Sequence, residues 1–289
     1  MNSFLISIVL TLSVISSGFS TPLDLKNTKR TPTLIISFSG LRADRLDEFL
    51  NINIMSYLKK EFVDVGVKAK YMEPSFPANI FPNIFSMMTG RYAENHGIIG
   101  DKFYDFTNKR LLLLSPSRYD LTPKYWTKST PFWLSDETKE VKVGSSFWIG
   151  SEVLGREPDI FLNFDKNYTF DSRSDDIVNW FKKFELELGL LSFTEPYETG
   201  FTYGPDSEEY LRKIEELDQQ LGLLLSKLNQ AGLLNSMNII IVGDVGMTTF
   251  KNTIILKDFV SESLINFNTT SYDVVANIRP INDSSVSLF

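Results

Sequence analysis

The 289-residue sequence contains no cysteine. Disulfide bonds, thiolate nucleophiles and thiolate metal sites are therefore excluded, and the fold has to be stabilised by core packing. Basic residues are not in excess either: 29 Lys and Arg stand against 36 Asp and Glu, a formal net charge of −7. Without a basic patch, the sequence lacks the electrostatic surface typical of a nucleic-acid-binding protein.

Long apolar runs are absent after the first twenty residues. The run from Phe4 to Ile15 is interrupted only by hydroxyl side chains and is followed by small residues up to Ser20. It is shorter than the ~20 residues that span a bilayer. We expect residues 1–20 to be a signal peptide, although no Lys or Arg precedes the run, and we expect the mature chain to have no transmembrane helix.

The sequence also has acceptor triplets for N-linked glycosylation, at Asn167, Asn268 and Asn282. Such triplets occur often by chance, but they agree with entry into the secretory pathway. We therefore expect a secreted, extracellular glycoprotein.

Hydrophobic residues make up 43% and aromatic residues 13% of the chain, which excludes general disorder and supports a large core. The length allows one to two domains, and no repeat or interdomain linker is evident. We expect residues 21–289 to form a single domain. The stretch Thr107 to Pro131, rich in Ser, Thr and Pro, is typical of a long surface excursion.

Short apolar runs alternate with helical patterns, which predicts an α/β fold with a mainly parallel sheet between helices. The clearest helix carries leucines and isoleucines at three- or four-residue spacing from Leu211 to Leu228. A second helix is indicated around Ile177 to Phe184, with Asp171 and Ser172 as capping candidates. The expected buried strands are Leu34 to Phe38, Val65 to Tyr71, Lys142 to Phe147, Leu188 to Phe193 and Asn238 to Val242.

Sites in open parallel sheets lie beyond the carboxyl ends of the strands. The segments that follow the predicted strands are Ser39–Gly40, Thr194–Pro205 and Gly243–Met247. These segments are where we expect functional side chains.

Six segments, in the same order, resemble the ectonucleotide pyrophosphatase/phosphodiesterase family of the alkaline phosphatase superfamily. The resemblance implies an alkaline-phosphatase-like core that is incomplete at the C terminus, because the family's domain continues beyond the position of Phe289. The segments are Leu34–Asp44 (LIISFSGLRAD), Pro77–Asn83 (PANIFPN), Met88–Ile99 (MTGRYAENHGII), Phe147–Ser151 (FWIGS), Glu195–Pro205 (EPYETGFTYGP) and Val242–Met247 (VGDVGM).

The resemblance implies a phosphodiesterase in which two zinc ions, held by Asp and His, activate a threonine that attacks phosphorus. This sequence departs from that pattern. The family's nucleophilic threonine falls on Ile80, and its first metal-binding aspartate falls on Ser39. The aspartate and histidine of another ligand motif fall on Tyr197 and Phe201.

The retained metal-ligand position is Asp244. The histidine that follows this aspartate in the family is replaced by Val245, and a further histidine lies beyond the stretch that can be compared. The sequence's one histidine, His96, falls in a family motif that does not ligate metal. We therefore expect no cofactor, where the family uses two zinc ions.

The implied phosphate pocket differs as well. An asparagine of the family falls on Asp101, and a carboxylate there would repel a phosphate unless it were protonated or turned outward. Phe81 and Phe161 match aromatic residues that hold the base in the family, although core packing is the alternative interpretation for both.

We consider three interpretations. The first is a secreted, catalytically inactive relative that binds a ligand or partner or has lost most function. The second is a rewired metal-dependent phosphodiester or pyrophosphate hydrolase that uses oxygens of Asp244, Glu195, Glu198 and Asp101. The third is an incomplete product without a stable fold. The sequence names no partner and does not separate nucleotides from choline phospholipids as the ancestral substrate.

Overall fold

The computed structural model describes residues 30–114, 125–135, 140–153, 155–268, 270 and 274–281. The expected signal peptide at 1–20 and the sequon asparagine Asn282 lie outside these residues. Every element described below belongs to the compact unit Pro32–Phe289. Among the described residues, no helix is long and apolar enough to cross a membrane.

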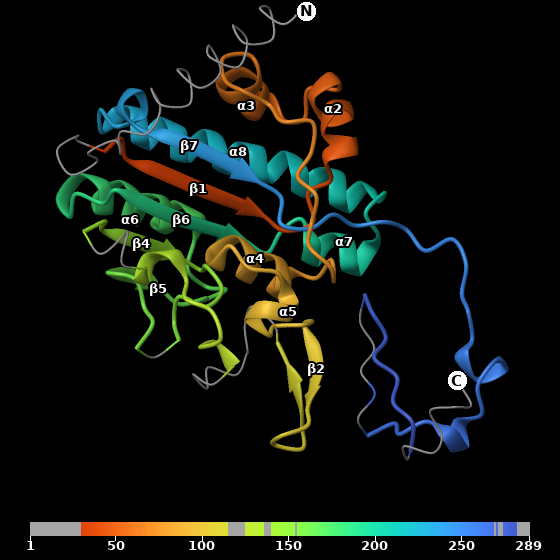
Figure 1. Ribbon diagram of the computed structural model, residues 1–289. Helices are drawn as coiled ribbons and strands as arrows, with labels where there is room; N and C mark the ends of the chain where they lie inside the picture. The colour runs from red at the N-terminus through yellow and green to blue at the C-terminus, as the bar shows by residue number, and fades with distance from the viewer. Residues whose placement is uncertain are drawn as a thin grey trace, which may run out of the picture. The chain divides into compact units, whose positions relative to one another are not determined.

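A five-stranded parallel sheet forms the centre of the fold, with the strand order β5-β4-β6-β1-β7 (Figure 1). β1 lies between two neighbours and is apolar at Leu34, Ile35, Ile36 and Phe38, as is typical of parallel strands covered on both faces. The predicted α/β fold with a parallel sheet is confirmed. The strands are β1 Thr33–Phe38, β4 Val143–Ser146, β5 Ile160–Leu162, β6 Leu188–Phe193 and β7 Asn238–Val242.

The register brings the carboxyl ends of the three strands β1, β6 and β7 to one edge of the sheet. Ser37 of β1 lies opposite Ser192 of β6 and opposite Val242 of β7. The segments that follow these strands therefore start side by side, as the sequence predicted.

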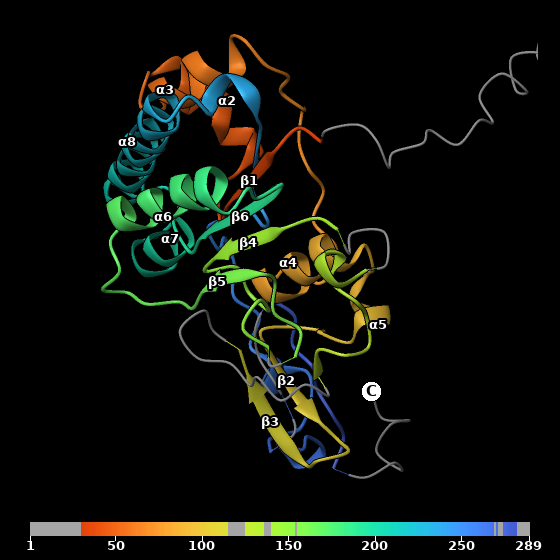
Figure 2. The ribbon, with the colours of Figure 1, turned by 90° about the vertical axis from the view of Figure 1, so that its left-hand side faces the viewer.

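One face of the sheet is covered by α2 Ala43–Asn51, α6 Phe170–Lys183 and α8 Glu208–Gln230 (Figure 2). The short α3 Ser56–Leu58 runs into the π-helical turn η2 Lys59–Val63 beside α8. α8 begins where the Ser207 side chain accepts a hydrogen bond from the Tyr210 N–H. Its predicted apolar stripe is buried in the first core cluster, at Ile214, Leu217, Leu221, Leu224 and Leu228.

The opposite face is covered by α4 Ile80–Thr89. This helix is apolar on nearly every side, because it is enclosed by the sheet and by the segments that surround it. Its neighbours in the second core cluster include residues of the hairpin β2 Lys102–Asp105 and β3 Arg110–Leu113 and of the turn η4 Phe132–Leu134. The short α5 Ala93–His96 also contacts α4.

Three sequence predictions are corrected. Val65 to Tyr71 is not a strand: it joins no ladder, and the Val67 side chain is fully exposed at 101%. Lys68 and Lys70 would share one face of such a strand, and both faces of this sheet are covered, so the strand would bury their charges. The predicted excursion Thr107 to Pro131 contains β3. The cap of α6 is Thr169, whose hydroxyl accepts from the Ser172 N–H, instead of Asp171 or Ser172.

Short elements flank β6 and β7. α7 Tyr197–Tyr203 follows β6, and η6 Leu234–Ser236 precedes β7. Beyond β7 the chain contains η7 Leu256–Asp258, η8 Glu262–Leu264 and one isolated bridge between Ile265 and Pro280.

Candidate functional site

Backbone hydrogen bonds join the ends of β1, β6 and β7 into one site. The Ser39 N–H donates to the Phe193 carbonyl at 3.0 Å, and the Tyr197 N–H donates to the Ser39 carbonyl at 2.8 Å. The Gly40 N–H donates to the Val245 carbonyl at 3.0 Å. Four of the positions singled out in the sequence, at residues 39, 197, 244 and 245, therefore lie on adjoining turns.

Gly40 makes this close approach possible. Its φ of +87° lies in the left-handed region, and a Cβ at this position would lie 2.8 Å from the Tyr197 Cα. A larger residue would push α7 away from the end of β1.

Asp244 is buried beneath these turns. Its Oδ2 accepts a hydrogen bond from the Ser39 hydroxyl at 2.5 Å, and its Oδ1 accepts from the Val245 N–H at 2.6 Å. Burial raises the pKa of Asp244 to about 6, even though these hydrogen bonds act to lower it. Both carboxylate oxygens of the retained ligand position are thus engaged by the protein itself.

Ile80 is the first residue of α4 and is buried. It belongs to the same core cluster as Val245, with Tyr197 packed against that cluster. Hydrocarbon therefore occupies the place where the family resemblance implies a nucleophile and a histidine.

Tyr197 and Phe201 lie on successive turns of α7. Their rings are stacked with centroids 6.1 Å apart, and Phe201 is 76% exposed. An aromatic pair with one ring in solvent thus stands in place of the implied aspartate and histidine.

Asp101 points towards the beginning of α4. Its Oδ1 accepts a hydrogen bond from the Phe81 N–H at 3.0 Å. Free N–H groups at a helix N terminus attract negative charge, so the carboxylate supplies an internal partner there. Asp101 is therefore not turned outward.

The aromatic positions predicted to hold a base differ in their surroundings. Phe81 is 1% exposed and packs in the second core cluster. Phe161 lies on the edge strand β5 and is half-buried. The structure does not bring these two side chains together in an open slot.

Arg173 is a residue that the sequence analysis did not single out. It is buried on α6, where its Nε donates to the Ser146 hydroxyl at 2.9 Å and its Nη2 donates to the Ser192 carbonyl at 2.7 Å. The guanidinium lies 4.0 Å from the centroid of the Phe147 ring and 5.1 Å from that of Phe193. Burial lowers its pKa to about 9. Its position four residues before buried Ile177 was the signal that could have revealed it.

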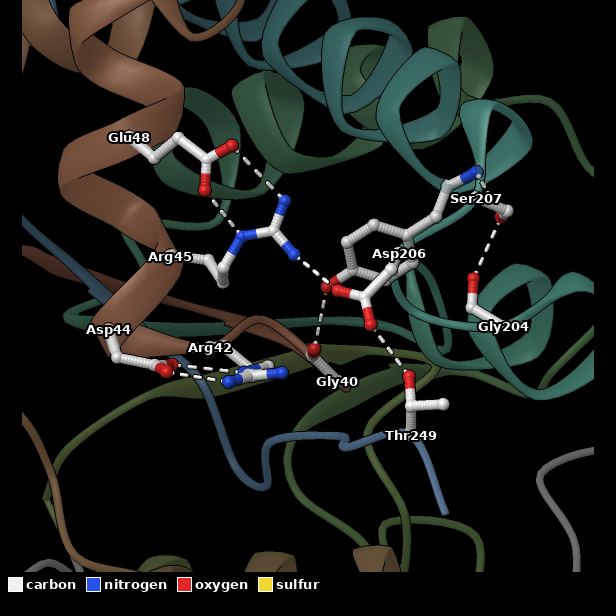
Figure 3. Close-up of polar contacts among 10 residues, drawn as sticks. Gly40, Arg42, Asp44, Arg45, Glu48, Gly204, Asp206, Ser207 and Thr249 are labelled. Atoms are coloured by element: carbon white, nitrogen blue, oxygen red, sulfur yellow. Dashed lines mark hydrogen bonds and ion pairs between the residues drawn. The ribbon is translucent and has the colours of Figure 1, made fainter. Parts of the chain in front are cut away.

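A surface network of charges lies beside this site (Figure 3). Arg45 donates to Glu48 and, at 2.5 Å, to Asp206, which also accepts from the Thr249 hydroxyl at 2.6 Å. Arg42 makes a two-pronged contact with Asp44. The network ties α2 to the turn before α8 and to the chain after β7, and both guanidinium groups are engaged within it.

The single histidine is enclosed. The Nδ1 of His96 accepts from the Ile98 N–H at 3.1 Å, and its Nε2 lies 3.0 Å from the Ser86 hydroxyl. Burial lowers its pKa to about 4, so the ring is neutral at physiological pH.

The residues present do not fit the pair of zinc ions that the family implies. No group of three or more His, Asp or Glu residues within the described part of the chain is arranged to hold a metal. Glu195 accepts from the N–H and hydroxyl of Thr199, and Glu198 is exposed. Asp244, Glu195 and Asp101 are therefore directed to separate partners, and Glu198 faces solvent.

Comparison with known proteins identifies the family. Residues 33–287 match the family Phosphodiest, described as type I phosphodiesterase/nucleotide pyrophosphatase. A bis(5'-adenosyl)-triphosphatase of Xenopus laevis is 30% identical over 268 residues, which cover 90% of this chain and 57% of the relative. Human ectonucleotide pyrophosphatase/phosphodiesterase family member 5 is 32% identical, with 84% of this chain and 50% of the relative covered. This chain thus spans about half the length of these relatives.

Solved structures agree with the sequence comparisons. An inactive variant of murine ectonucleotide pyrophosphatase/phosphodiesterase 5 in complex with AMP superposes with a TM-score of 0.75 and 28% identity. The match covers 86% of this chain and 66% of the murine chain. The chain belongs to the type I phosphodiesterase/nucleotide pyrophosphatase family.

Proposed function

We propose that this chain is a catalytically inactive, secreted member of its family that holds no zinc and acts by binding a ligand or partner. The observation that carries the proposal is Ile80 at the start of α4, because its hydrocarbon side chain has no atom that can attack phosphorus. Ile80 packs in the second core cluster with hydrophobic neighbours that include Phe81 and Val245.

The electrostatics support loss of metal binding. Clustered carboxylates need a cation to offset their repulsion and desolvation. Here a single buried carboxylate, Asp244, is offset by hydrogen bonds from Ser39 and Val245. The surrounding Tyr and Val side chains require no cation.

The same reasoning opposes nucleotide binding of the kind seen with the murine relative. AMP carries a phosphate, and the Asp101 carboxylate already accepts from the Phe81 N–H at the start of α4. We expect no heat of binding when AMP is titrated into the protein. Heat that disappears on removal of the nucleotide's phosphate would contradict this part of the proposal.

Secretion is supported by the relatives, whose names place them outside the cell, and by Asn167 and Asn268, which are both exposed. Expressed in a secretory host, the protein should appear in the medium, cleaved near Ser20 and carrying glycan at Asn167. An Asn167→Gln variant should lose the mass of one glycan, and an unprocessed cytosolic product would remove the extracellular assignment.

The activity test compares wild type with Ile80→Thr, on a generic phosphodiester with and without added zinc. We expect neither protein to turn over, because the Ile80→Thr variant restores a hydroxyl but still lacks metal ligands at residues 39, 197, 201 and 245. The Xenopus laevis bis(5'-adenosyl)-triphosphatase serves as the positive control. Zinc-dependent turnover by wild type would support the rewired hydrolase instead.

A further inference from the structure

A polar hollow lies beside the end of α4. Its volume is about 430 Å³, which falls in the range of small-ligand sites, roughly 300 to 1,000 Å³. It is formed by the connection from α4 into α5 and by the segment 128–130, and it shares no residue with the site at the ends of β1, β6 and β7. The described residues that line it are all polar: Thr89, Arg91, Asn95, Lys128, Ser129 and Thr130.

Two positive charges line the polar hollow, and neither is neutralised. Within the described part of the chain, no ion pair or hydrogen bond involves the side chain of Arg91 or Lys128, and no Asp or Glu lines the polar hollow. The guanidinium groups of Arg42 and Arg45, in contrast, are both paired with carboxylates. In a chain with a net charge of −7, the polar hollow is therefore a local positive site.

The surrounding backbone holds Lys128 at the polar hollow. Its side chain lies against Gly97, the left-handed residue that follows α5: a Cβ at Gly97 would lie 2.7 Å from the Lys128 Cδ. The Nη2 of half-buried Arg156 donates to the Ser129 carbonyl at 2.7 Å and so fixes the segment that carries Lys128. Arg156 also adds a third positive charge behind this segment.

The remaining polar groups suit a ligand that both donates and accepts hydrogen bonds. The Thr89 hydroxyl donates to the Phe85 carbonyl at 2.7 Å, so its oxygen is left to accept from a ligand. The Asn95 amide and the hydroxyls of Ser129 and Thr130 can donate or accept. A bare oxyanion only accepts, whereas a sugar hydroxyl does both.

We propose that the polar hollow binds a sulfated sugar of an extracellular glycan. Arg91 and Lys128 hold the sulfate, because its tetrahedral oxygens accept the charge-assisted hydrogen bonds that guanidinium and ammonium groups donate. Asn95 and Thr89 hold the sugar hydroxyls. The proposal rests on the proposed secretion, since such glycans lie outside the cell, but it does not depend on the loss of catalysis.

A nucleotide fits the polar hollow less well than a sulfated sugar. No apolar side chain is found among its described lining residues, so an adenine base has no surface on which to pack. AMP would gain only exposed ion pairs, which contribute little free energy, in agreement with the absence of AMP binding expected above. A glycan instead presents many sulfates and hydroxyls along one chain, which raises its apparent affinity.

The first test is the binding of a heparin-derived tetrasaccharide to the purified full chain, measured by calorimetry at low ionic strength. We expect wild type to bind, and added salt to weaken the binding. Arg91→Gln and Lys128→Gln should each weaken it by about tenfold or more, because each removes a charge-assisted hydrogen bond. Lys128→Arg keeps the charge and should recover most of the affinity that Lys128→Gln loses.

Lys183→Gln is the matched control. Lys183 is exposed in the last turn of α6 and does not line the polar hollow, yet its substitution changes the net charge by the same amount. This variant should bind as wild type does. Two further probes test the ligand chemistry: the tetrasaccharide without its sulfates and sodium sulfate should each bind about tenfold more weakly or worse.

The proposal is overturned by a wild type that does not bind the sulfated tetrasaccharide, by a Lys183→Gln variant that loses as much affinity as Lys128→Gln, or by equal binding of the desulfated sugar. Sodium sulfate that binds as tightly as the tetrasaccharide would show a site for the bare oxyanion and would also overturn it. Because the protein is purified first, these results are independent of whether it reaches the medium, which tests secretion separately. Circular dichroism of each variant establishes that it is folded.

Discussion

The Ser39 hydroxyl and the Asp244 carboxylate meet at 2.5 Å although 205 residues separate them in the chain. The contact joins the end of β1 to the end of β7, where the family resemblance implies two metal-binding aspartates. A neutral donor at one of these positions converts a cation site into a hydrogen-bonded pair.

Restoring the second carboxylate should destabilise the protein. Ser39→Asp places two carboxylates in one buried site, which costs roughly 1 to 3 kcal/mol of unfolding free energy at neutral pH. The measurement is the denaturation midpoint at about pH 5 and about pH 8, with and without zinc; protonation of one carboxyl should relieve part of the loss at the lower pH.

Ser39→Asn is the matched control for that experiment. It has nearly the size of Asp but no charge, so it separates crowding from repulsion. An unchanged midpoint for Ser39→Asp, or stabilisation by zinc, would mean that a working metal site persists.

Asp244 should make stability depend on pH. Burial raises its folded-state pKa from 3.8 to about 6, so the folded protein binds more protons than the unfolded chain between these values. The protonated Asp244 therefore stabilises the folded state below about pH 4, and this stabilisation is lost as the pH rises through about 6. The free energy of unfolding changes by about 2 to 3 kcal/mol across this range. Asp244→Asn should remove this dependence, which chemical denaturation at a series of pH values measures.

His96 acts in the opposite direction and must be separated from Asp244. Its pKa falls from 6.5 to about 4 on burial. The stabilising contribution of the neutral His96 ring is therefore complete above pH 6.5 and is lost as the pH falls towards 4. Because both proteins compared above retain His96, the difference between wild type and Asp244→Asn isolates the carboxylate. A difference that does not change with pH would contradict the burial of a charged Asp244.

Arg173 should be required for the stability of the fold but not for the binding of a ligand. It binds the ends of β4 and β6 through Ser146 and Ser192 and lies over two aromatic rings. Arg173→Met keeps most of the volume but leaves buried acceptors without donors, which costs about 1 to 3 kcal/mol. The free energy of unfolding measures the effect. Arg212→Met, at an exposed position on α8, is the control and should stay within about 0.5 kcal/mol of wild type.

The sequence predicts the sheet well where apolar runs are continuous. β1, β6, β7 and the stripe of α8 follow from periodicity, because parallel strands and their crossover helices bury whole runs. Val65–Tyr71 has a similar apolar content, but Lys68 and Lys70 would lie on one face of the strand, and a sheet covered on both faces would bury them. The proximity of Ser39 and Asp244 follows from the rule that strand carboxyl ends share one edge.

Other parts of the site depend on tertiary contacts between residues far apart in the sequence, which local sequence patterns do not predict. Asp101 lies 20 residues after Phe81, beyond α4 and α5, so only the fold decides whether its carboxylate faces inward. Arg173 reads as one more polar residue of an amphipathic helix until the ends of β4 and β6 are placed around it. Nothing in β7 itself indicates that it lies at an edge.

The most direct test of the central claim is elemental analysis of the purified secreted protein, with phosphodiester hydrolysis assayed on the same sample. The account predicts zinc well below one ion per chain and no turnover, because Ser39, Tyr197 and Val245 cannot ligate as aspartate and histidine do. Tightly bound stoichiometric zinc together with hydrolysis that a chelator abolishes would contradict it.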